Sequence, residues 1–278
     1  SPDTYIFKYG PLGPVEEKGI RREKMYFVGA KREFIEHLIR IFENEGFRNI
    51  SLITDVAEAY VQVAKSLRAE KESFAILDIG GRHTGLYIFR SGRLTFVREI
   101  LTAGESFTDA LVSGLGLTFE EAEREKIEKG FTEETKPYLS PPLERLAGEV
   151  ERTIDVYNQS YPLEPCTRIY VTGRGSRIRG LMERLKEFLP IESTPFVLDI
   201  PIEEEFFPAY VISFSQRIFN LLPVEKIEWK KEIRLRRMGI GLSILTLLTL
   251  SFLSFELTGK LKSLELAIGT EKRLIAEK

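Results

Sequence analysis

The sequence predicts a mixed α/β domain followed by one membrane-spanning helix. The α/β class follows from short apolar runs of strand character that alternate with segments of helical periodicity over residues 4–189. The membrane helix follows from Met238–Phe255, an uncharged and proline-free run of 18 residues. At the rise of an α-helix this run spans about 27 Å, close to the hydrocarbon core of about 30 Å.

Composition excludes several kinds of chemistry. Among 278 residues, 43% are apolar, which is enough for a folded core. A single cysteine, Cys166, excludes an internal disulfide, and two histidines, His37 and His83, make a histidine zinc site improbable. The net charge of −2 does not favour a nucleic-acid partner. Site chemistry is therefore expected from backbone geometry, carboxylates and hydroxyls.

The first third of the domain predicts two strands and two helices. The strands are expected at Thr4–Tyr9 and Lys24–Ala30. The first helix is expected at Lys31–Glu45, where one face carries Phe34, Leu38, Ile41 and Phe42. The second helix is expected at Val56–Leu67, because Asp55 and Glu58 have the spacing of a capping box.

The segment Phe74–Ile100 is the most informative part of the chain. It predicts three strands joined by a glycine-rich turn and by Ser91-Gly92. In the first turn, glycines at 80 and 81 would let backbone N–H groups approach a phosphate. Asp78 could hold Mg²⁺ through water, and the Thr84 hydroxyl could bond a phosphate oxygen. The alternative is an ordinary β-hairpin turn with a structural aspartate.

A second glycine turn follows a further set of helices. A strand at Arg168–Val171 leads into Thr172–Ser176 and then into a helix, a geometry in which a nucleotide can lie against the turn. The intervening segments predict helices at Leu101–Ser113, Thr118–Lys129 and Leu143–Tyr157 and a loop at Pro137–Pro142.

Four stretches, in this order, resemble a known family. They are LDIGGRHTGLYIFRSGRLTFVREI (77–100), GLGLTFEEAEREK (114–126), GEVERTIDVY (148–157) and IYVTGRGSRIRGL (169–181). Together they resemble the type IV pilus assembly protein PilM family and the cytoplasmic domain of its type II secretion counterpart, protein L. The resemblance covers about residues 5–200 and implies an actin/Hsp70-like, ribonuclease H-like fold.

The resemblance also implies a nucleotide site. ATP and Mg²⁺ would be bound by Asp78, Gly80, Gly81, Thr84, Glu149, Arg152, Gly173, Gly175 and Ser176, with Asp78 holding the metal through water. The family's first phosphate loop lies upstream of these stretches and is absent, which agrees with an interpretation of both chain ends as cuts. Arg174 interrupts the expected consecutive glycines and could crowd the adenine or ribose. Similarity to PilM implies ATP binding, whereas similarity to protein L implies a domain that has lost it.

A further resemblance lies at FNLLP, residues 219–223. This segment resembles the cytoplasmic start of the pilus protein PilN, which docks on PilM, and it implies docking in cis through Asn220, Leu221, Leu222 and Pro223. An ordinary linker with two exposed leucines is the alternative. The expected organisation is an actin-like domain at 1–215, a docking segment and basic linker at 216–237, a membrane helix at 238–257 and the start of a periplasmic coiled coil at 258–278.

Charge and apolar spacing set the orientation expected in the membrane. Basic residues are concentrated before the apolar run, so the positive-inside rule puts the domain in the cytoplasm and the C-terminus in the periplasm of a bacterial inner-membrane protein. Apolar residues recur after the run with the spacing of a dimerising helix, at Leu257, Leu261, Leu264, Ile268 and Ile275.

The resemblance implies an adaptor function. The chain would bind the cytoplasmic motor ATPase and other inner-membrane proteins of a pilus or secretion platform, with little or no ATP hydrolysis. Two alternatives stay open at this point. One is an enzyme that hydrolyses ATP or transfers phosphate, for which Asp78 is the visible acid near a phosphate loop. The other is an actin homologue of cell division.

Overall fold

The computed structural model describes residues 4–17, 19–47, 49–66, 72–196, 206–214 and 219–276. The chain divides into two compact units. The first, called the α/β unit below, comprises Ser1–Lys31 and Ile53–Leu221. The second, called the helical unit, comprises Arg32–Leu52 and Leu222–Lys278.

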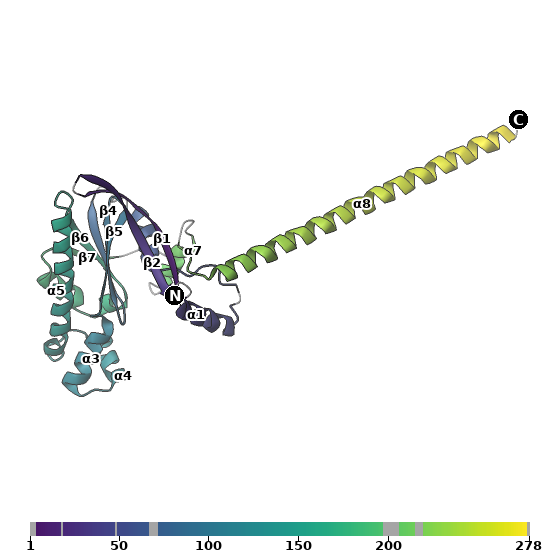
Figure 1. Cartoon of the computed structure of the whole chain (residues 1–278). Helices are drawn as coiled ribbons and strands as arrows, with labels where there is room; N and C mark the ends of the chain where they lie inside the picture. Colours follow the sequence, from purple (N-terminus) through teal and green to yellow (C-terminus); the bar gives the residue numbers. More distant parts are fainter. Residues whose placement is uncertain are drawn as a thin grey trace. The chain divides into compact units, whose positions relative to one another are not determined.

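A five-stranded sheet forms the centre of the α/β unit, with strand order β5-β4-β3-β6-β7 (Figure 1). β3 pairs antiparallel with β4 and parallel with β6 and is therefore the central strand. Its side chains are largely buried on both faces of the sheet. The predicted run of three strands over residues 74–100 is confirmed, as is the strand that precedes the second glycine turn. The strands are β3 (Ser73–Ile79), β4 (Thr84–Arg90), β5 (Arg93–Ile100), β6 (Cys166–Thr172) and β7 (Glu192–Pro195).

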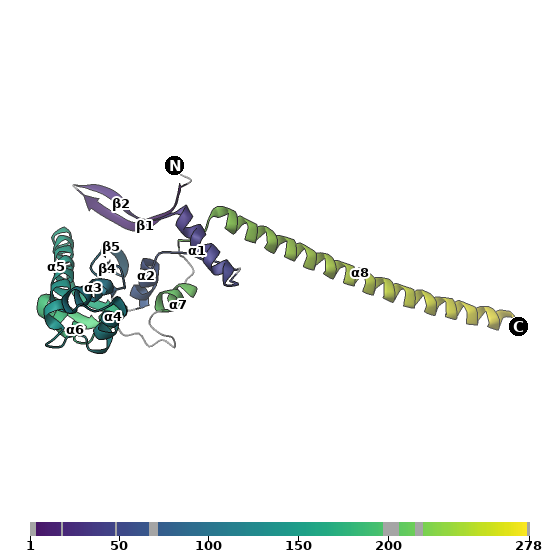
Figure 2. The same cartoon turned by 90° about the horizontal axis from the view of Figure 1, so that it is seen from below.

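Helices cover both faces of this sheet. Alternate side chains of β3 enter two separate hydrophobic clusters, Phe74 and Ile76 on one face and Leu77 and Ile79 on the other. Figure 2 shows the helices on the two sides. The first face is covered by α2 (Ala57–Ser66) and α7 (Phe207–Ser213), and the second by α3 (Gly104–Leu115), α4 (Phe119–Glu128), α5 (Lys136–Ser160) and α6 (Leu181–Phe188).

The predicted loop at 137–142 is wrong, because these residues form the beginning of α5. Pro137 lies in the first turn of α5, where its missing N–H would have no partner, whereas Pro141 and Pro142 lie further inside the helix. Hydrogen bonds of Thr135 hold the helix start in place. Its buried hydroxyl donates to the Gly130 carbonyl at 2.5 Å and accepts from the Thr132 backbone N–H at 2.9 Å.

The first two predicted strands belong to a longer hairpin, β1 (Tyr5–Glu17) and β2 (Ile20–Lys31). Its register shifts between Pro11 and Gly13. One face of the hairpin buries Ile6 and Val28, while the opposite face exposes aromatic rings that stack along the strands. The expected strands are therefore present but extend further toward the turn.

Two helices make up the helical unit, α1 (Arg32–Asn44) and α8 (Val224–Ala276). Two ion pairs join the start of α8 to the two ends of α1. An Arg32 guanidinium nitrogen lies 3.5 Å from a Glu225 carboxylate oxygen, and Lys226 Nζ lies 2.8 Å from a Glu43 carboxylate oxygen. The helix predicted at 31–45 is confirmed, but the predicted apolar face is not the buried one. α1 buries Ile35 and Ile39 and exposes Phe34, Ile41 and Phe42.

α8 is continuous over 53 residues and contains the apolar run. Within the described part of the chain, Met238–Leu264 is the one helical segment long and apolar enough to cross a membrane, and none of it is buried. The leucines expected at a coiled-coil seam lie exposed on this single helix. The coiled coil itself remains a prediction.

Candidate functional site

The candidate site lies where two parallel strands of the α/β unit end. Asp78 is the next-to-last residue of β3 and pairs in register with Thr172, the last residue of β6. Because the carboxyl ends of parallel strands meet at one edge of a sheet, the turns after β3 and β6 are brought together there. These are the two glycine turns that the sequence singles out.

A cavity of about 190 Å³ opens between the two turns. Pockets for drug-sized ligands usually have volumes of about 300–1,000 Å³. The cavity is therefore smaller than a complete nucleoside triphosphate requires, and it offers room for only a part of one, such as a phosphate group. Its lining comes from both turns and from the helices of one sheet face: Tyr60, Asp78, Gly80, Gly81, Thr172, Gly173, Arg174, Arg177, Phe207 and Pro208.

Asp78 is held by a tyrosine on α2. Its Oδ2 atom accepts a hydrogen bond of 2.8 Å from the Tyr60 hydroxyl. Burial raises the pKa of the Asp78 carboxyl, and the hydrogen bond from Tyr60 opposes that rise. Burial and the negative charge of Asp78 also raise the pKa of Tyr60, so that its hydroxyl remains a donor at any physiological pH. The arrangement supplies one oriented carboxylate at the cavity.

Packing explains most of the glycines. Gly173 has φ +88°, and a Cβ atom there would lie 2.3 Å from Asp78 Oδ1. A Cβ on Gly80 would lie 2.6 Å from the His83 carbonyl oxygen, and one on Gly175 would lie 2.3 Å from the Ile79 side chain. Gly81 is different, because nothing lies within 4 Å of its Cβ position. Of these glycines, Gly81 therefore leaves open space that a ligand could use.

The N-terminus of α3 positions the first turn. Backbone N–H groups of Gly104 and Glu105 donate to the carbonyls of Gly80 and Gly81, at 2.9 and 2.7 Å. The second turn continues into a 3-10 helix, η2 (Arg174–Arg177), in which the Ser176 hydroxyl donates to the Gly173 carbonyl at 2.7 Å. Both turns are thus braced by hydrogen bonds within the chain.

Two arginines give the cavity a cationic side. Arg174 and Arg177 are the first and last residues of η2, and both line the cavity. Guanidinium groups suit phosphate and carboxylate oxygens, because their planar donors can bind two oxygens at once. The arginine that interrupts the predicted glycine turn is therefore part of the cavity wall, where it takes up space near the site and adds positive charge.

Five residues predicted for the site do not line this cavity: Thr84, Glu149, Arg152, Gly175 and Ser176. Thr84 is buried, and its hydroxyl donates to the Thr102 carbonyl at 2.8 Å, so it is occupied in holding the strand end. Glu149 on α5 forms ion pairs with Arg98 of β5 and with Arg152. Thr84, Glu149 and Arg152 thus have partners within the protein and lie outside the wall of this cavity.

Sequence reasoning missed several lining residues. Arg177 could have been found, because it lies one helical turn after Arg174 in the segment that follows the strand. Thr172 could also have been found as the first residue of the predicted glycine turn. Tyr60 and Phe207 carry no local signal, because they reach the cavity from helices far from the turns in sequence.

The segment expected to dock lies against the α/β unit at Ile53. The Asn220 side-chain oxygen accepts from the Ile53 backbone N–H at 3.3 Å, and the Leu221 N–H donates to the Ile53 carbonyl at 2.7 Å. The Phe219 ring lies 5.7 Å from the ring of Tyr26. Leu221, Leu222 and Pro223 are all buried.

A family model and a solved structure point to the same family. Residues 3–199 match the family model described as type IV pilus assembly protein PilM. The solved structure of a PilM–PilN type IV pilus biogenesis complex superposes with a TM-score of 0.63 at 22% identity, over 77% of this chain and 66% of that chain. This likeness supports the actin-like ATPase fold.

Two curated proteins match a shorter part. Cell division protein FtsA of Bacillus subtilis (strain 168) is 30% identical over 121 residues, which are 42% of this chain and 27% of FtsA. Ethanolamine utilization protein EutJ of Escherichia coli (strain K12) is 29% identical over 117 residues, which are 42% of this chain and 39% of EutJ. The matched part thus spans less than half the length of either curated relative.

Proposed function

This chain belongs to the family of the type IV pilus assembly protein PilM, and from that premise we propose that it is a membrane-bound adaptor of the pilus assembly machine. The adaptor links the cytoplasmic motor ATPase to periplasmic partners through one polypeptide. The observation that carries the proposal is the hydrogen-bonded contact of Leu221 with Ile53, immediately before a long apolar helix.

Docking in cis is the first part of the proposal. The segment at 219–223 resembles the start of PilN, and a solved PilM relative is described as a complex with PilN. In this chain the corresponding residues are already tethered to the domain. A tether raises the effective concentration of the segment, so that modest contacts are enough to keep it docked.

The second part is a single crossing of the inner membrane. The apolar stretch of α8 supports it by length and composition. The excess of lysine and arginine before this stretch supports a cytoplasmic domain and a periplasmic C-terminus. Before the uncharged run Met238–Phe255 lie Lys226, Lys230, Lys231, Arg234, Arg236 and Arg237, and in the nearest stretch after it lie Lys260 and Lys262. The leucine spacing beyond the membrane supports a coil that pairs with a second copy or a related protein.

Cysteine labelling tests this topology in intact cells. Cys166 is the only native cysteine; it is buried, and burial raises its pKa to about 12, so it should not react. A cysteine in place of the exposed Ser263 should react with a membrane-impermeant maleimide from outside the inner membrane. The matched variant Ser113→Cys, exposed on α3, should react only after lysis. The reverse pattern would overturn the proposed orientation.

The third part is a nucleotide that orders the domain. We propose ATP with Mg²⁺, held by Asp78 through water and by the turn at Gly80 and Gly81, with Gly173, Gly175 and Ser176 on the side of the nucleoside. When bound, the nucleotide supplies negative charge that the arginines of the cavity wall complement. It acts by binding one state of the domain more tightly than another.

Binding without turnover is favoured by the composition of the cavity wall. Among the described residues that line it, Asp78 is the one carboxylate, and Tyr60 engages it. A phosphoryl-transfer enzyme also needs an acid or base that orients the attacking water or hydroxyl. The enzyme alternative therefore requires a second group from outside the described cavity wall.

Calorimetric titration of the protein with ATP in the presence of Mg²⁺ tests whether the nucleotide binds. Asp78→Ala should weaken binding at least about tenfold, which is about 1.4 kcal/mol. Asp109→Ala, which removes an exposed carboxylate on α3 outside the cavity wall, should leave affinity unchanged. A folded wild type that binds no ATP would refute the proposed nucleotide binding, but it would not affect the adaptor proposal. Phosphate release well above that of Asp78→Ala would instead favour the enzyme.

A further inference from the structure

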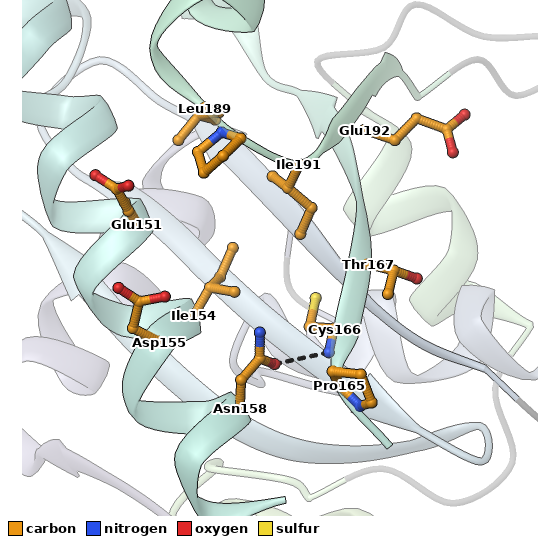
Figure 3. Close-up of a pocket in the computed structure, with 11 residues that line it drawn as sticks. Glu151, Ile154, Asp155, Asn158, Pro165, Cys166, Thr167, Leu189, Ile191 and Glu192 are labelled. Atoms are coloured by element: carbon orange, nitrogen blue, oxygen red, sulfur yellow. Dashed lines mark hydrogen bonds between the residues drawn. The ribbon is translucent and has the colours of Figure 1, made fainter. Parts of the chain in front are cut away.

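A second cavity lies at the opposite edge of the same sheet, between α5 and the starts of β6 and β7 (Figure 3). Its volume is about 340 Å³, within the range that holds a large side chain or a small ligand. None of the residues of the candidate nucleotide site lines it. The lining consists of Glu151, Ile154, Asp155, Asn158, Pro165, Cys166, Thr167, Leu189, Pro190, Ile191 and Glu192.

The floor of this cavity is apolar and rigid. Ile154, Cys166 and Leu189 are buried members of the main hydrophobic cluster. The Asn158 side-chain oxygen accepts from the Cys166 backbone N–H at 2.8 Å, which ties the end of α5 to the first residue of β6 (Figure 3). Since burial raises the pKa of the Cys166 thiol to about 12, the thiol contributes packing rather than a nucleophile.

The rim of the cavity is acidic and uncompensated. Glu151 and Asp155 project from one face of α5, four residues apart, and both are exposed. Like charges at this spacing on a helix repel each other. Within the described part of the chain, neither carboxylate has a lysine or arginine partner, whereas the third acid, Glu192, is paired with Arg168 at 3.1 Å. Two negative charges thus face solvent beside an apolar floor.

We propose that this cavity is a docking site for a partner protein, which inserts one apolar side chain flanked by lysine or arginine. The apolar floor accepts the inserted side chain, and the two free carboxylates pair with the flanking cations, as charge complementarity requires. Because β6 runs from this cavity to the nucleotide-side turn, one strand would connect the partner to the other candidate site.

A labelled peptide tests the site on the full chain in phosphatidylcholine nanodiscs, whose neutral lipid does not attract cations. The probe is a fluorescein-labelled helical peptide of leucine, alanine and lysine, and binding is measured by anisotropy. The double variant Glu151→Gln with Asp155→Asn should weaken binding about tenfold at low salt. Thr167→Trp, at an exposed lining position, should weaken it by filling the cavity while leaving the charge unchanged.

Matched controls separate docking from general attraction. Glu120→Gln with Glu128→Gln removes two exposed charges from α4 and should leave binding unchanged. The same peptide with glutamate in place of lysine should not bind. Equal losses in the two double variants, unchanged binding in Thr167→Trp, or no binding of the lysine peptide to the wild type would each overturn the proposal. Circular dichroism checks that every variant is folded.

Discussion

Asp78 combines two properties that favour a functional role for a single residue. It is placed at the end of a central strand by the sheet register, and it is half-buried beside a hydroxyl that orients it. The sequence identifies Asp78 because an acid at a strand end followed by glycines is a local pattern. Tyr60 could not be identified in the same way, because its contact with Asp78 depends on how α2 packs on the sheet.

A pair of glycine substitutions distinguishes architecture from ligand contact. Gly173→Ala should destabilise the α/β unit by about 1–3 kcal/mol, because the position has positive φ and its Cβ would collide with Asp78. Gly81→Ala should leave stability nearly unchanged, since its Cβ meets open space, but should weaken Mg²⁺–ATP binding. Urea unfolding and calorimetry measure the two effects. Equal stability of the two variants would contradict this division of roles.

The pH dependence of stability tests the environment of Asp78. Its pKa in the folded chain is raised above the ordinary value of 3.8, so the folded state binds the proton more tightly than the unfolded state. The resulting stabilisation is complete below the ordinary value and is lost as pH rises through the folded-state pKa. The free energy of unfolding of the wild type, minus that of Asp78→Asn, should therefore fall as pH rises above about 4.

Urea titrations at a series of pH values, followed by circular dichroism in detergent, give this difference. Other titrating groups are common to both chains and cancel to first order. A difference that rises with pH would mean that the carboxyl pKa is lowered, and that Tyr60 outweighs burial.

At the scale of elements, prediction succeeds where local pattern decides the outcome. The three strands over residues 74–100 follow from apolar runs and turn residues that are neighbours in the sequence. Prediction from the sequence fails where a longer-range contact decides which structure forms. The helix start at Lys136 depends on Thr135 reaching back to Gly130, and the proline content alone suggests a loop.

The same difference between local pattern and longer-range contact explains why some of the predicted site residues do not line the cavity. Thr84 follows the glycine turn and has the right chemistry for a phosphate, but the Thr102 carbonyl takes its hydroxyl. Glu149 is likewise taken by Arg98 on a neighbouring strand. Sequence spacing shows which groups could serve a ligand, whereas only the folded chain shows which of them already have a protein partner.

At the scale of the whole molecule, a short series of contacts connects the candidate nucleotide site with the docked segment. Asp78 accepts from Tyr60 on α2, and Asp55 caps the start of that helix by accepting from the Ala57 N–H at 2.8 Å. Two residues before Asp55, Ile53 bonds Leu221. A ligand that alters the Asp78–Tyr60 hydrogen bond therefore acts on the helix whose approach segment holds the docked residues.

The last prediction concerns coupling between these two places. Leu221→Asp with Leu222→Asp should expel the docking segment, because burying a carboxylate without a partner costs more than the roughly 2–7 kcal/mol of an unpaired neutral polar group. Limited proteolysis near residues 219–223 should become at least about tenfold faster, as the open state becomes populated. Leu163→Asp, at a leucine already exposed to solvent, serves as the matched control and should change nothing.

If these contacts couple the docked segment to the candidate nucleotide site, the same double variant should also change the affinity for Mg²⁺–ATP. ATP should in turn change the rate of proteolysis of the wild type. Linkage requires the two effects to have the same factor, since each reports one coupling free energy of about 1–3 kcal/mol. Faster proteolysis with unchanged ATP affinity would refute the coupling while leaving cis docking intact. Unchanged proteolysis would refute the docking itself, and with it the view that the domain is held beneath the membrane by its own chain.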